Sequence, residues 1–397
     1  MPANKATNNS IYDFAYTKIG QPETEDDTTQ QEDKFETKPA FRLGIVGIGQ
    51  CGNNFVTAFD EIGYKKLLAI NTAKNDLDSV DDSIEKLLIG NHHGAGKDPE
   101  AGRECVKAKT TRIRTTMCRL FESRVDKIVI CMGLGGGTGS GGGPEVVKIA
   151  KDLIKEWRGD PEKDVIVIAT LPEPITAGSR VCYNALLAYR EIETLHVPRL
   201  YVDNGKMQNV IPSTIGSRWS KMNHWVATTL HQFNSYAGKT SEYGNFDGQD
   251  LNDVLSRGRF IFSAIPILTL DDKFSVGDMI AQYLERSLFT KMNLKTAVAA
   301  GCIMILNEAT VADRDPRDLS PAFSTLNSMM QKGSTLHNGV YLENIVPPRK
   351  GEKPLDLLCY VMLGGLDHPQ ETLELLFEKG KSSAPEEFGT LSAIIDA

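Results

Sequence analysis

The chain has 397 residues, of which 41% are apolar, and a formal net charge of -8. This length suits two or three domains, and the apolar content excludes wholesale disorder. The acidic balance argues against direct binding to nucleic acid or to an anionic membrane surface. No apolar run approaches the ~20 residues of a membrane span, and the first ten residues lack a hydrophobic signal core. The seven scattered cysteines form no CxxC pair, which argues against a disulfide framework or a structural zinc site. We therefore expect a cytoplasmic protein.

Residues 1–41 differ in composition from the rest of the chain. The first 40 residues carry eight acidic side chains and four lysines, and the stretch 21–40 has almost no apolar content. Such a segment cannot bury enough apolar surface to fold, so we predict a disordered acidic arm. It is either a solvated tail or an arm that binds a regulator or partner.

The next part of the chain alternates between strand and helix patterns. This alternation predicts an α/β fold with a Rossmann-like parallel sheet and helices on both faces. Strands are expected at 42–47, 66–71, 86–90, 127–132, 164–170 and 199–202, and helices at 51–62, 99–121, 144–157 and 177–194.

The second half of the chain predicts one long helix at about 215–240, followed by a polar loop at 238–248. A separate, smaller α/β domain should follow, and 382–397 should be a loose tail. Its expected strands are 259–267, 297–307 and 355–363, and its expected helices are 276–288, 321–330 and 369–377.

A first glycine motif, G-x-G-x-x-G at Gly47–Gly52, opens a helix directly after the first strand. This motif is typical of a Rossmann dinucleotide site, in which the helix N-terminus binds phosphate. Such sites place an acidic residue at the end of the second strand to hold the ribose. Here the uncharged Asn71 stands at that position, which weakens this interpretation without removing it. An NAD-binding oxidoreductase therefore stands as an alternative interpretation.

A second motif, GLGGGTGSGGG at Gly133–Gly143, follows the fourth strand and contains eight glycines in eleven residues. Glycines let the backbone turn tightly and direct several N–H groups at one anion. Thr138 and Ser140 add hydroxyl donors, and a helix starting at Pro144 adds its dipole. We predict a phosphate cradle. No complete G-x-x-x-x-G-K-S/T motif occurs, since the Gly-Lys-Thr at 238–240 and the Gly-Lys-Ser at 380–382 lack its first glycine, which argues against a lysine-centred P-loop.

These motifs resemble those of the tubulin/FtsZ superfamily of GTPases. Gly135–Gly141 (GGGTGSG) resembles the signature loop, Gly47–Asn54 (GIGQCGNN) the first loop, Asn71–Lys74 the second and Gly94–Gly96 the third. The resemblance implies a GTP-binding domain at 42–218, a central helix with a catalytic loop at 219–257, and a smaller C-terminal α/β domain at 258–381.

The resemblance also implies which residues contact GTP or GDP. Magnesium would be held mainly by phosphate oxygens and water, with Gln50 nearby. Thr176 stands where FtsZ has a ribose-binding glutamate, so sugar recognition should differ. The implied nucleotide contacts are Gly49, Gln50, Cys51, Gly52, Asn54, Ala95, Gly96, Gly135, Gly136, Gly137, Thr138, Gly139, Ser140, Arg180, Asn204, Trp219 and Asn223.

An acidic loop, N-F-D-G-Q-D at 245–250, follows the long helix. A helix of about 20 residues spans roughly 30 Å, so this loop should not reach its own nucleotide. In the superfamily the loop enters the nucleotide site of the next subunit. Asp247 and Asp250 would then orient the attacking water. Both could also cap the helix that follows, and the two roles are compatible.

The resemblance thus predicts a GTPase that polymerises head to tail into a dynamic filament, with hydrolysis dependent on assembly. A tubulin-like filament protein with little hydrolysis is a further alternative, against which the acidic loop argues. Division, cell shape and the positioning of plasmid or phage DNA are all possible roles. The C-terminal segment carries no basic cluster but has a short apolar stretch at 388–395, which could dock on an adaptor protein.

Overall fold

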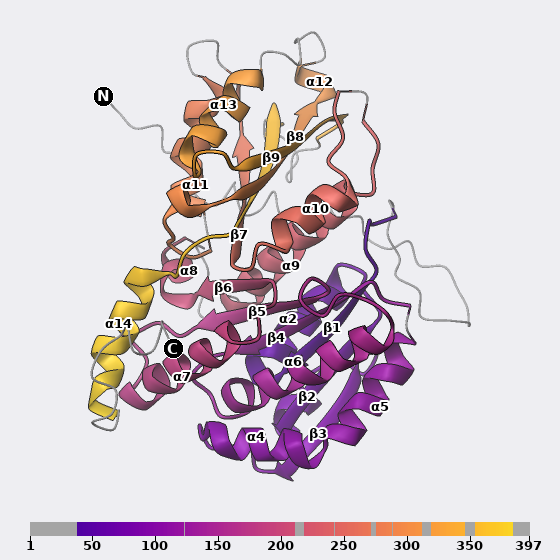
Figure 1. Ribbon diagram of the computed structural model, residues 1–397, viewed down its shortest axis with the longest axis vertical. Coiled ribbons are helices and arrows are strands. Elements are labelled where there is room, and N and C mark those ends of the chain that lie inside the picture. The colour runs from indigo at the N-terminus through magenta and orange to yellow at the C-terminus, as the bar shows by residue number, and fades with distance from the viewer. Residues whose placement is uncertain are drawn as a thin grey trace. The chain divides into compact units, whose positions relative to one another are not determined.

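The computed structural model describes residues 38–122, 124–210, 218–241, 243–270, 275–287, 289–311, 319–345 and 354–383 (Figure 1). The chain divides into two compact units. The six-stranded unit comprises Phe41–Lys206 and the segment that starts at Pro369, and the four-stranded unit contains Met207–His368. Residues 1–37 of the expected acidic arm, and residues 384–397 of the expected tail, lie outside the described residues.

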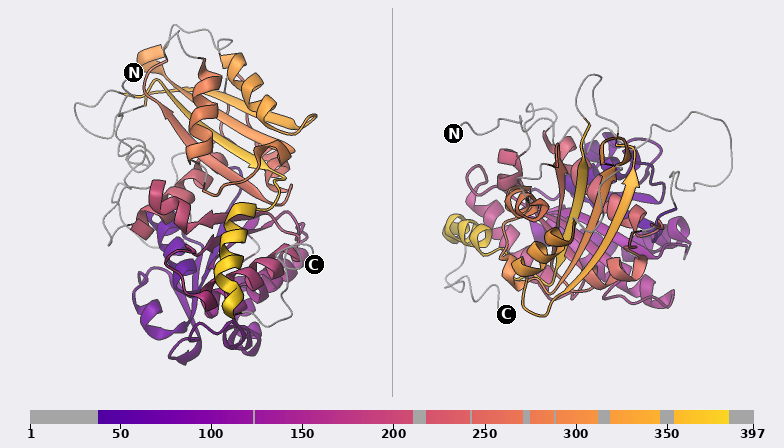
Figure 2. Two further views of the ribbon diagram at one scale, coloured as in Figure 1. Left: turned by 90° about the vertical axis from the view of Figure 1, so that its left-hand side faces the viewer. Right: turned by 90° about the horizontal axis from the view of Figure 1, so that it is seen from above.

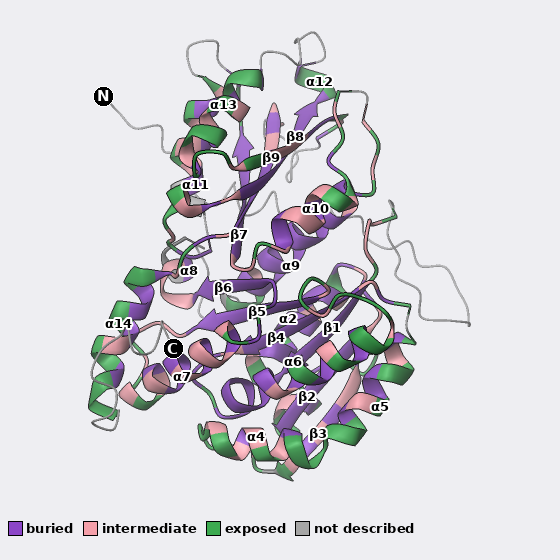
Figure 3. Cartoon of the chain, viewed as in Figure 1, coloured by how far each residue is buried: buried purple, intermediate pink, exposed green. Residues whose placement is uncertain are grey.

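The six-stranded unit is built on a fully parallel sheet with the strand order β3-β2-β1-β4-β5-β6. This order confirms the Rossmann-like α/β fold expected from the alternating pattern. Most positions of these strands are buried, as expected for a parallel sheet covered on both faces (Figure 3). The strands are β1 (Leu43–Ile48), β2 (Leu67–Ala73), β3 (Glu85–His92), β4 (Lys127–Gly133), β5 (Val165–Leu171) and β6 (Arg199–Asp203).

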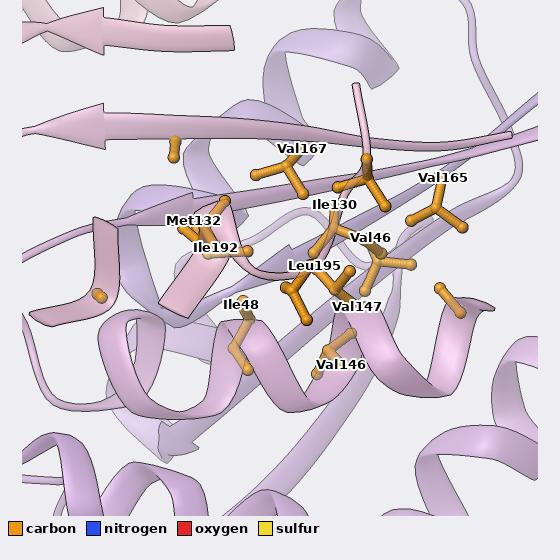
Figure 4. Close-up of a cluster of buried hydrophobic side chains, with 14 of the residues drawn as sticks. Val46, Ile48, Ile130, Met132, Val146, Val147, Val165, Val167, Ile192 and Leu195 are labelled. Atoms are coloured by element: carbon orange, nitrogen blue, oxygen red, sulfur yellow. The ribbon is translucent and has the colours of Figure 1, made fainter. Parts of the chain in front are cut away.

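Side chains that alternate along the strands build an apolar core on each face of this sheet. Val46 and Ile48 of β1 pack with Val146 and Val147 of α6 (Thr138–Glu156), as Figure 4 shows. Gly47 points to the opposite face, because a Cβ built there would lie 2.7 Å from Val56 of α2. The other helices of this unit are α2 (Gly49–Glu61), α3 (Lys74–Asp78), α4 (Pro99–Ala108), α5 (Thr110–Phe121), α7 (Ser179–Glu193) and α14 (Gln370–Gly380), and α8 (Asn204–Val210) follows β6.

Two helices of this unit differ from the sequence prediction. The single helix expected at 99–121 is two helices, which meet at Lys109. The Thr110 hydroxyl donates to the carbonyls of Val106 and Lys107 at this junction, and such side-chain bonds compete with the helix ladder. The prediction that Pro144 starts a helix was wrong, since α6 begins at Thr138 and Pro144 lies inside it. Tertiary packing of the glycines overrides their low helix propensity.

Helix α14 packs on α7 within the six-stranded unit (Figure 1). The Thr372 hydroxyl donates to the buried carboxylate of Asp203 at 2.6 Å. Ser382 and Ser383, the first residues of the expected tail, hydrogen-bond the Ser179 hydroxyl. The C-terminal domain expected at 258–381 therefore includes a helix, α14, that packs within the six-stranded unit.

The four-stranded unit contains a mixed sheet with the order β7-β10-β8-β9, in which only β8 and β9 run parallel. Figure 2 shows this sheet with helices packed along it. The edge strand β9 was not anticipated, because its first half is polar and Gly339 interrupts its pattern. The strands are β7 (Phe260–Ile267), β8 (Ala299–Asn307), β9 (Thr335–Glu343) and β10 (Leu357–Gly364), and the helices are α9 (Arg218–Tyr236), α10 (Gly248–Leu255), α11 (Val276–Ser287), α12 (Glu308–Val311) and α13 (Ser320–Met329).

The long helix predicted at 215–240 is α9, which is described from Arg218 to Tyr236. The last residues of the arm expected at 1–41 make a defined contact, since the Ala40 N–H donates to the carbonyl of Asn234 on α9. Among the described residues, no helix is both long and apolar enough to span a membrane.

Candidate functional site

The first loop joins β1 to α2 and contains two positions, Gly49 and Gly52, that require glycine. Gly49 has a φ of +73°, and a Cβ there would lie 3.2 Å from the Gly139 amide nitrogen. A Cβ at Gly52 would lie 2.2 Å from the Cys131 carbonyl oxygen, so only glycine lets α2 approach β4 this closely. No side chain caps the N-terminus of α2, and Gln50 is exposed there. The backbone N–H groups of this turn are thus available to an anion.

Cys51 lies between the ends of β4 and β5. Its sulfur is 3.1 Å from the Thr170 hydroxyl, and burial raises the pKa of its thiol. The thiol is therefore neutral and serves packing rather than nucleophilic chemistry. Asn54, the expected base contact one turn further along α2, is exposed.

The glycine loop between β4 and α6 is held from inside by hydroxyl groups. Gly135 turns the chain at a φ of +107°, and its N–H donates to the Ser140 hydroxyl at 2.7 Å. The Thr138 and Thr72 hydroxyls are 2.7 Å apart, which joins this loop to the end of β2. Both hydroxyls expected to face an anion are thus engaged within the protein, and Ser140 is 1% exposed.

Gly136 is the one exposed residue among positions 134–140. A Cβ built at Gly136 would meet nothing within 4 Å. Next to it, a Cβ at Gly137 would lie 2.7 Å from the Ala95 Cβ and 2.8 Å from the Asp98 carbonyl oxygen. No side chain caps the α6 N-terminus that Gly137 precedes. The open space at Gly136 therefore lies where an uncapped helix start can receive an anion.

The glycines after Gly137 have a second role that the sequence analysis did not foresee. A Cβ at Gly141 would overlap the Pro99 carbonyl, and one at Gly143 would lie 2.4 Å from the Met132 sulfur. These residues lie in the first turns of α6 and let α4 and β4 approach its backbone. Part of the glycine content is thus required for helix packing rather than for phosphate.

The third loop has a strained backbone that α7 supports. Gly94, Gly96 and Lys97 have φ values of +81°, +57° and +61°, and a lysine rarely adopts this region. The Asn184 amide donates to the Lys97 carbonyl at 2.9 Å and to the Gly135 carbonyl at 3.3 Å. Asn184 thus ties the third loop to the glycine loop, a role that the sequence analysis missed. The sequence feature that could have revealed this role is that Asn184 is a polar residue on the apolar face of the helix α7.

The second loop uses Asn71 for its own turn. The Asn71 side-chain oxygen accepts from the N–H groups of Thr72 and Ala73, and its amide donates to Asp76. Asn71 is 1% exposed. Its side chain therefore holds the loop and offers no free acceptor for a ribose, which argues against the dinucleotide interpretation.

The loops that follow β5 and β6 carry further candidates. Arg180 is exposed at the start of α7, and the Thr176 hydroxyl donates to Glu173 at 2.6 Å. Glu173 also lies beside Gly205 after β6, since a Cβ there would be 3.2 Å from its Cγ. The sequence analysis missed this carboxylate because it considered only Thr176 at the ribose position.

A few buried amides have no partner within the described residues. These are Asn53, which is 1% exposed and lacks partners for both side-chain polar atoms, and the side-chain oxygens of Asn204 and Asn223. An unpartnered buried amide is costly, and a purine edge can satisfy both its donor and its acceptor. Asn204 and Asn223 were expected contacts of the nucleotide, whereas Asn53 was missed in favour of Asn54.

In the four-stranded unit, the predicted pair on α9 differs in exposure. Trp219 is 41% exposed and Asn223 is 2% exposed, although they lie four residues apart.

The acidic loop forms a capping box at the start of α10. The Asp247 side chain accepts from the N–H groups of Gln249 and Asp250, and the Asp250 side chain accepts from the Asp247 N–H. The helix-cap role foreseen for both residues is confirmed.

A family model described as "Tubulin/FtsZ family, GTPase domain" matches residues 42–212, which contain all six parallel strands and the glycine loops. Residues 42–212 are similar to the GTPase domain of the tubulin/FtsZ family. The match confirms the resemblance carried by the GGGTGSG loop.

Curated tubulin/FtsZ relatives align over different shares of the chain. The tubulin-like protein CetZ of Pyrococcus horikoshii is 26% identical over 311 residues, which cover 76% of this chain and 81% of that protein. The cell division protein FtsZ 2 of Halobacterium salinarum is 27% identical over 224 residues, or 55% of this chain and 53% of that protein. The chain thus spans about half the length of the FtsZ proteins that it matches.

Solved tubulin/FtsZ structures share the fold. CetZ2 from Haloferax volcanii, in a GTPγS-bound protofilament, is 19% identical with a TM-score of 0.70, covering 86% of this chain and 99% of that chain. TubZ of Bacillus thuringiensis serovar israelensis, in a GTPγS-form protofilament, is 21% identical with a TM-score of 0.71, covering 90% and 95%.

The predicted tubulin/FtsZ site residues fall into two groups. The first, third and signature loops meet in the six-stranded unit, through the contacts of Gly49 with Gly139 and of Ala95 with Gly137. Trp219, Asn223 and the acidic loop belong to the four-stranded unit. Among the described residues, no group of three His, Cys, Asp or Glu side chains is arranged to hold a metal ion.

Proposed function

We propose that this tubulin/FtsZ-family protein binds and hydrolyses GTP and polymerises head to tail. The observation that carries the proposal is the open space at Gly136, beside the uncapped start of α6, within a family GTPase domain. The N–H groups of this loop and of the first loop would bind the phosphates. Within the six-stranded unit, the unpartnered Asn53 amide and the unpartnered Asn204 side-chain oxygen fit a purine base, and the family resemblance adds Asn223.

Other predicted contacts fit the same nucleotide. Gly49, Gly52, Ala95, Gly96 and Gly137 would shape the phosphate loops, while Thr138, Ser140 and Asn184 hold them in place. Arg180 would contact ribose or phosphate. Glu173 would supply a carboxylate that accepts hydrogen bonds from the ribose hydroxyls, which Thr176 cannot provide. Trp219 would pack on the base.

A magnesium ion bound with the nucleotide would neutralise phosphate charge, as in related phosphoryl-transfer sites. The described residues offer no cluster of three His, Cys, Asp or Glu side chains, and an ion held mostly by phosphate oxygens and water would not need one. Gln50, exposed on the first turn of α2, would contact it through water.

Hydrolysis is proposed to need the acidic loop of a neighbouring copy. Asp247 and Asp250 would orient the attacking water toward the γ-phosphate. The helix cap uses one lone pair of each engaged oxygen, and a carboxylate oxygen has a second that can accept from water. A heterologous contact of this kind repeats without closing and builds an open filament.

The proposal is tested by measuring GTP turnover and sedimentation over a range of protein concentrations, with NAD binding as the comparison. The proposal expects turnover per subunit to rise with the polymerised fraction. NAD binding without GTP binding would support the oxidoreductase interpretation instead, and GTP-dependent polymer with negligible turnover would support a filament protein with little hydrolysis.

A further inference from the structure

A histidine from the unanticipated strand β9 contacts the acidic loop. The His337 Nδ1 is 2.7 Å from the Asp250 Oδ1, and its Nε2 is 2.9 Å from the Asp253 Oδ2. Asp250 and Asp253 lie on one face of α10, three residues apart. The three side chains are 19%, 24% and 26% exposed, so water reaches the cluster without fully solvating it.

The two contacts of the ring determine its proton count. An ionised carboxylate only accepts hydrogen bonds, and a neutral imidazole has a single N–H. The Nε2 contact with Asp253 is a hydrogen bond, and an unprotonated Nδ1 would be repelled by an ionised Asp250 oxygen 2.7 Å away, so both contacts are favourable only if His337 carries two ring protons or if one carboxyl group is protonated. Partial burial opposes ionisation of Asp253, yet hydrogen bonds from His337 and Arg257 lower the pKa of its carboxyl below the ordinary value. The second proton therefore belongs on the ring.

The other groups around His337 leave this assignment intact. Arg257, just after α10, donates to the second oxygen of Asp253, at 2.5 Å. Tyr341 of β9 is neutral, because burial raises the pKa of its phenol and the nearby Asp250 and Asp247 carboxylates raise it further. Its hydroxyl contacts the Phe246 backbone. The ring thus faces two carboxylates of α10.

We propose that His337 is a positioning residue for GTP hydrolysis, which acts by holding Asp250 in one orientation as an ionised carboxylate. The inference rests on the proposed function of Asp250. One Asp250 oxygen lies 2.7 Å from the His337 Nδ1 and the other accepts from the Asp247 N–H at 3.1 Å, so the carboxylate cannot rotate freely. The remaining lone pairs then point in fixed directions toward water. Asp250 held in this way orients the attacking water.

The first test compares His337→Gln with the wild type and with Asp250→Asn. Glutamine is neutral and can donate to only one of the two carboxylates. We expect GTP affinity and sedimented polymer within about twofold of the wild type, and turnover per polymerised subunit about 10- to 100-fold lower, as for a catalytic group that loses its alignment. The exposed His196, in the other unit, gives a matched control, since His196→Gln should leave turnover unchanged.

The pH profile separates positioning from a structural role. The wild type and His196→Gln should share one pH profile of turnover, and His337→Gln should differ from it. In the Asp250→Asn background, His337→Gln should cause no further loss. An equal loss in that background would overturn the inference, because His337 would then act elsewhere.

A second test does not depend on activity. The ¹⁵N spectrum of histidine-labelled protein distinguishes a doubly protonated ring from either neutral tautomer, and its absence in His337→Gln assigns the resonance. A doubly protonated His337 ring at neutral pH is expected, and a neutral ring would overturn the inference. Wild-type turnover in Asp250→Asn would instead overturn the proposed role of Asp250, and a turnover and pH profile unchanged by His337→Gln, with Asp250→Asn inactive, would overturn the inference alone.

Discussion

Substituting Gly136 tests the phosphate loop without disturbing the protein. A Cβ at Gly136 meets nothing within 4 Å, and its backbone lies outside the left-handed region. Gly136→Ala should therefore fold normally, within about 0.5 kcal/mol of the wild type, as for other exposed sites. The neighbouring Gly137 is the contrast, because a Cβ there would lie 2.7–2.9 Å from Ala95 and the Asp98 backbone. Gly137→Ala should lose about 1–3 kcal/mol through overpacking.

The effect of Gly136 substitutions on binding follows from the same geometry. A methyl group at Gly136 would occupy the space proposed for a phosphate, and displacing one charge-assisted hydrogen bond costs about 1.5–3 kcal/mol. This corresponds to GTP affinity weaker by about 10- to 150-fold, with a larger loss for Gly136→Val.

Calorimetric titration and thermal melting together check this prediction. Guanosine is the ligand control, because it has no phosphate and should bind the wild type and Gly136→Ala equally. A wild-type GTP affinity in both Gly136→Ala and Gly136→Val, with normal melting, would refute the assignment of this loop.

Three further predictions concern other residues. Asn204→Ala should weaken GTP binding by about 3- to 10-fold with little change in stability, since its side-chain oxygen has no partner within the described residues; an unchanged affinity in titration would exclude Asn204 as a base contact. Thr372→Val should cost about 1–3 kcal/mol by leaving the buried Asp203 oxygen unpaired, which a lower melting temperature would show and an unchanged one would contradict. Burial lowers the pKa of His231 from 6.5 to about 4. The unfolded chain therefore binds the extra proton first, and stability that is full above pH 6.5 should fall by about 3 kcal/mol as the pH drops to 4; urea unfolding of His231→Gln should lack this part of the slope, and an identical slope would contradict the burial argument.

The six-stranded unit was readable from the sequence because its signals are local. Apolar strands bounded by glycine turns, such as Lys127–Gly133, predict a buried parallel strand whatever lies around them. The glycine motif at Gly47–Gly52 marked the start of α2 for the same reason. The start of α6 was misplaced because Pro144 looks like a first-turn residue. The helix start is decided instead by contacts of Gly141 and Gly143 with distant elements.

The site was only partly readable, because several of its residues act through tertiary contacts. Nothing near Asn184 in the sequence shows that its amide joins two loops, 87 and 49 residues away. His337 is a similar case, since β9 itself was missed and its partner Asp250 is distant in the chain. By contrast, Asp247 and Asp250 cap α10 through neighbours three residues apart, which sequence spacing does reveal.

The central claim, that two copies complete one active site, is tested most directly by mixing two defective variants. Asp250→Ala should bind GTP but lose most hydrolysis, and Gly136→Val should keep its acidic loop but bind GTP poorly. Mixed in equal amounts, they should regain turnover that neither shows alone, and the regained rate should rise faster than linearly with total protein. Wild-type turnover that stays strictly proportional to protein concentration, down to dilutions without polymer, would contradict the claim, because one chain would then hold a complete site.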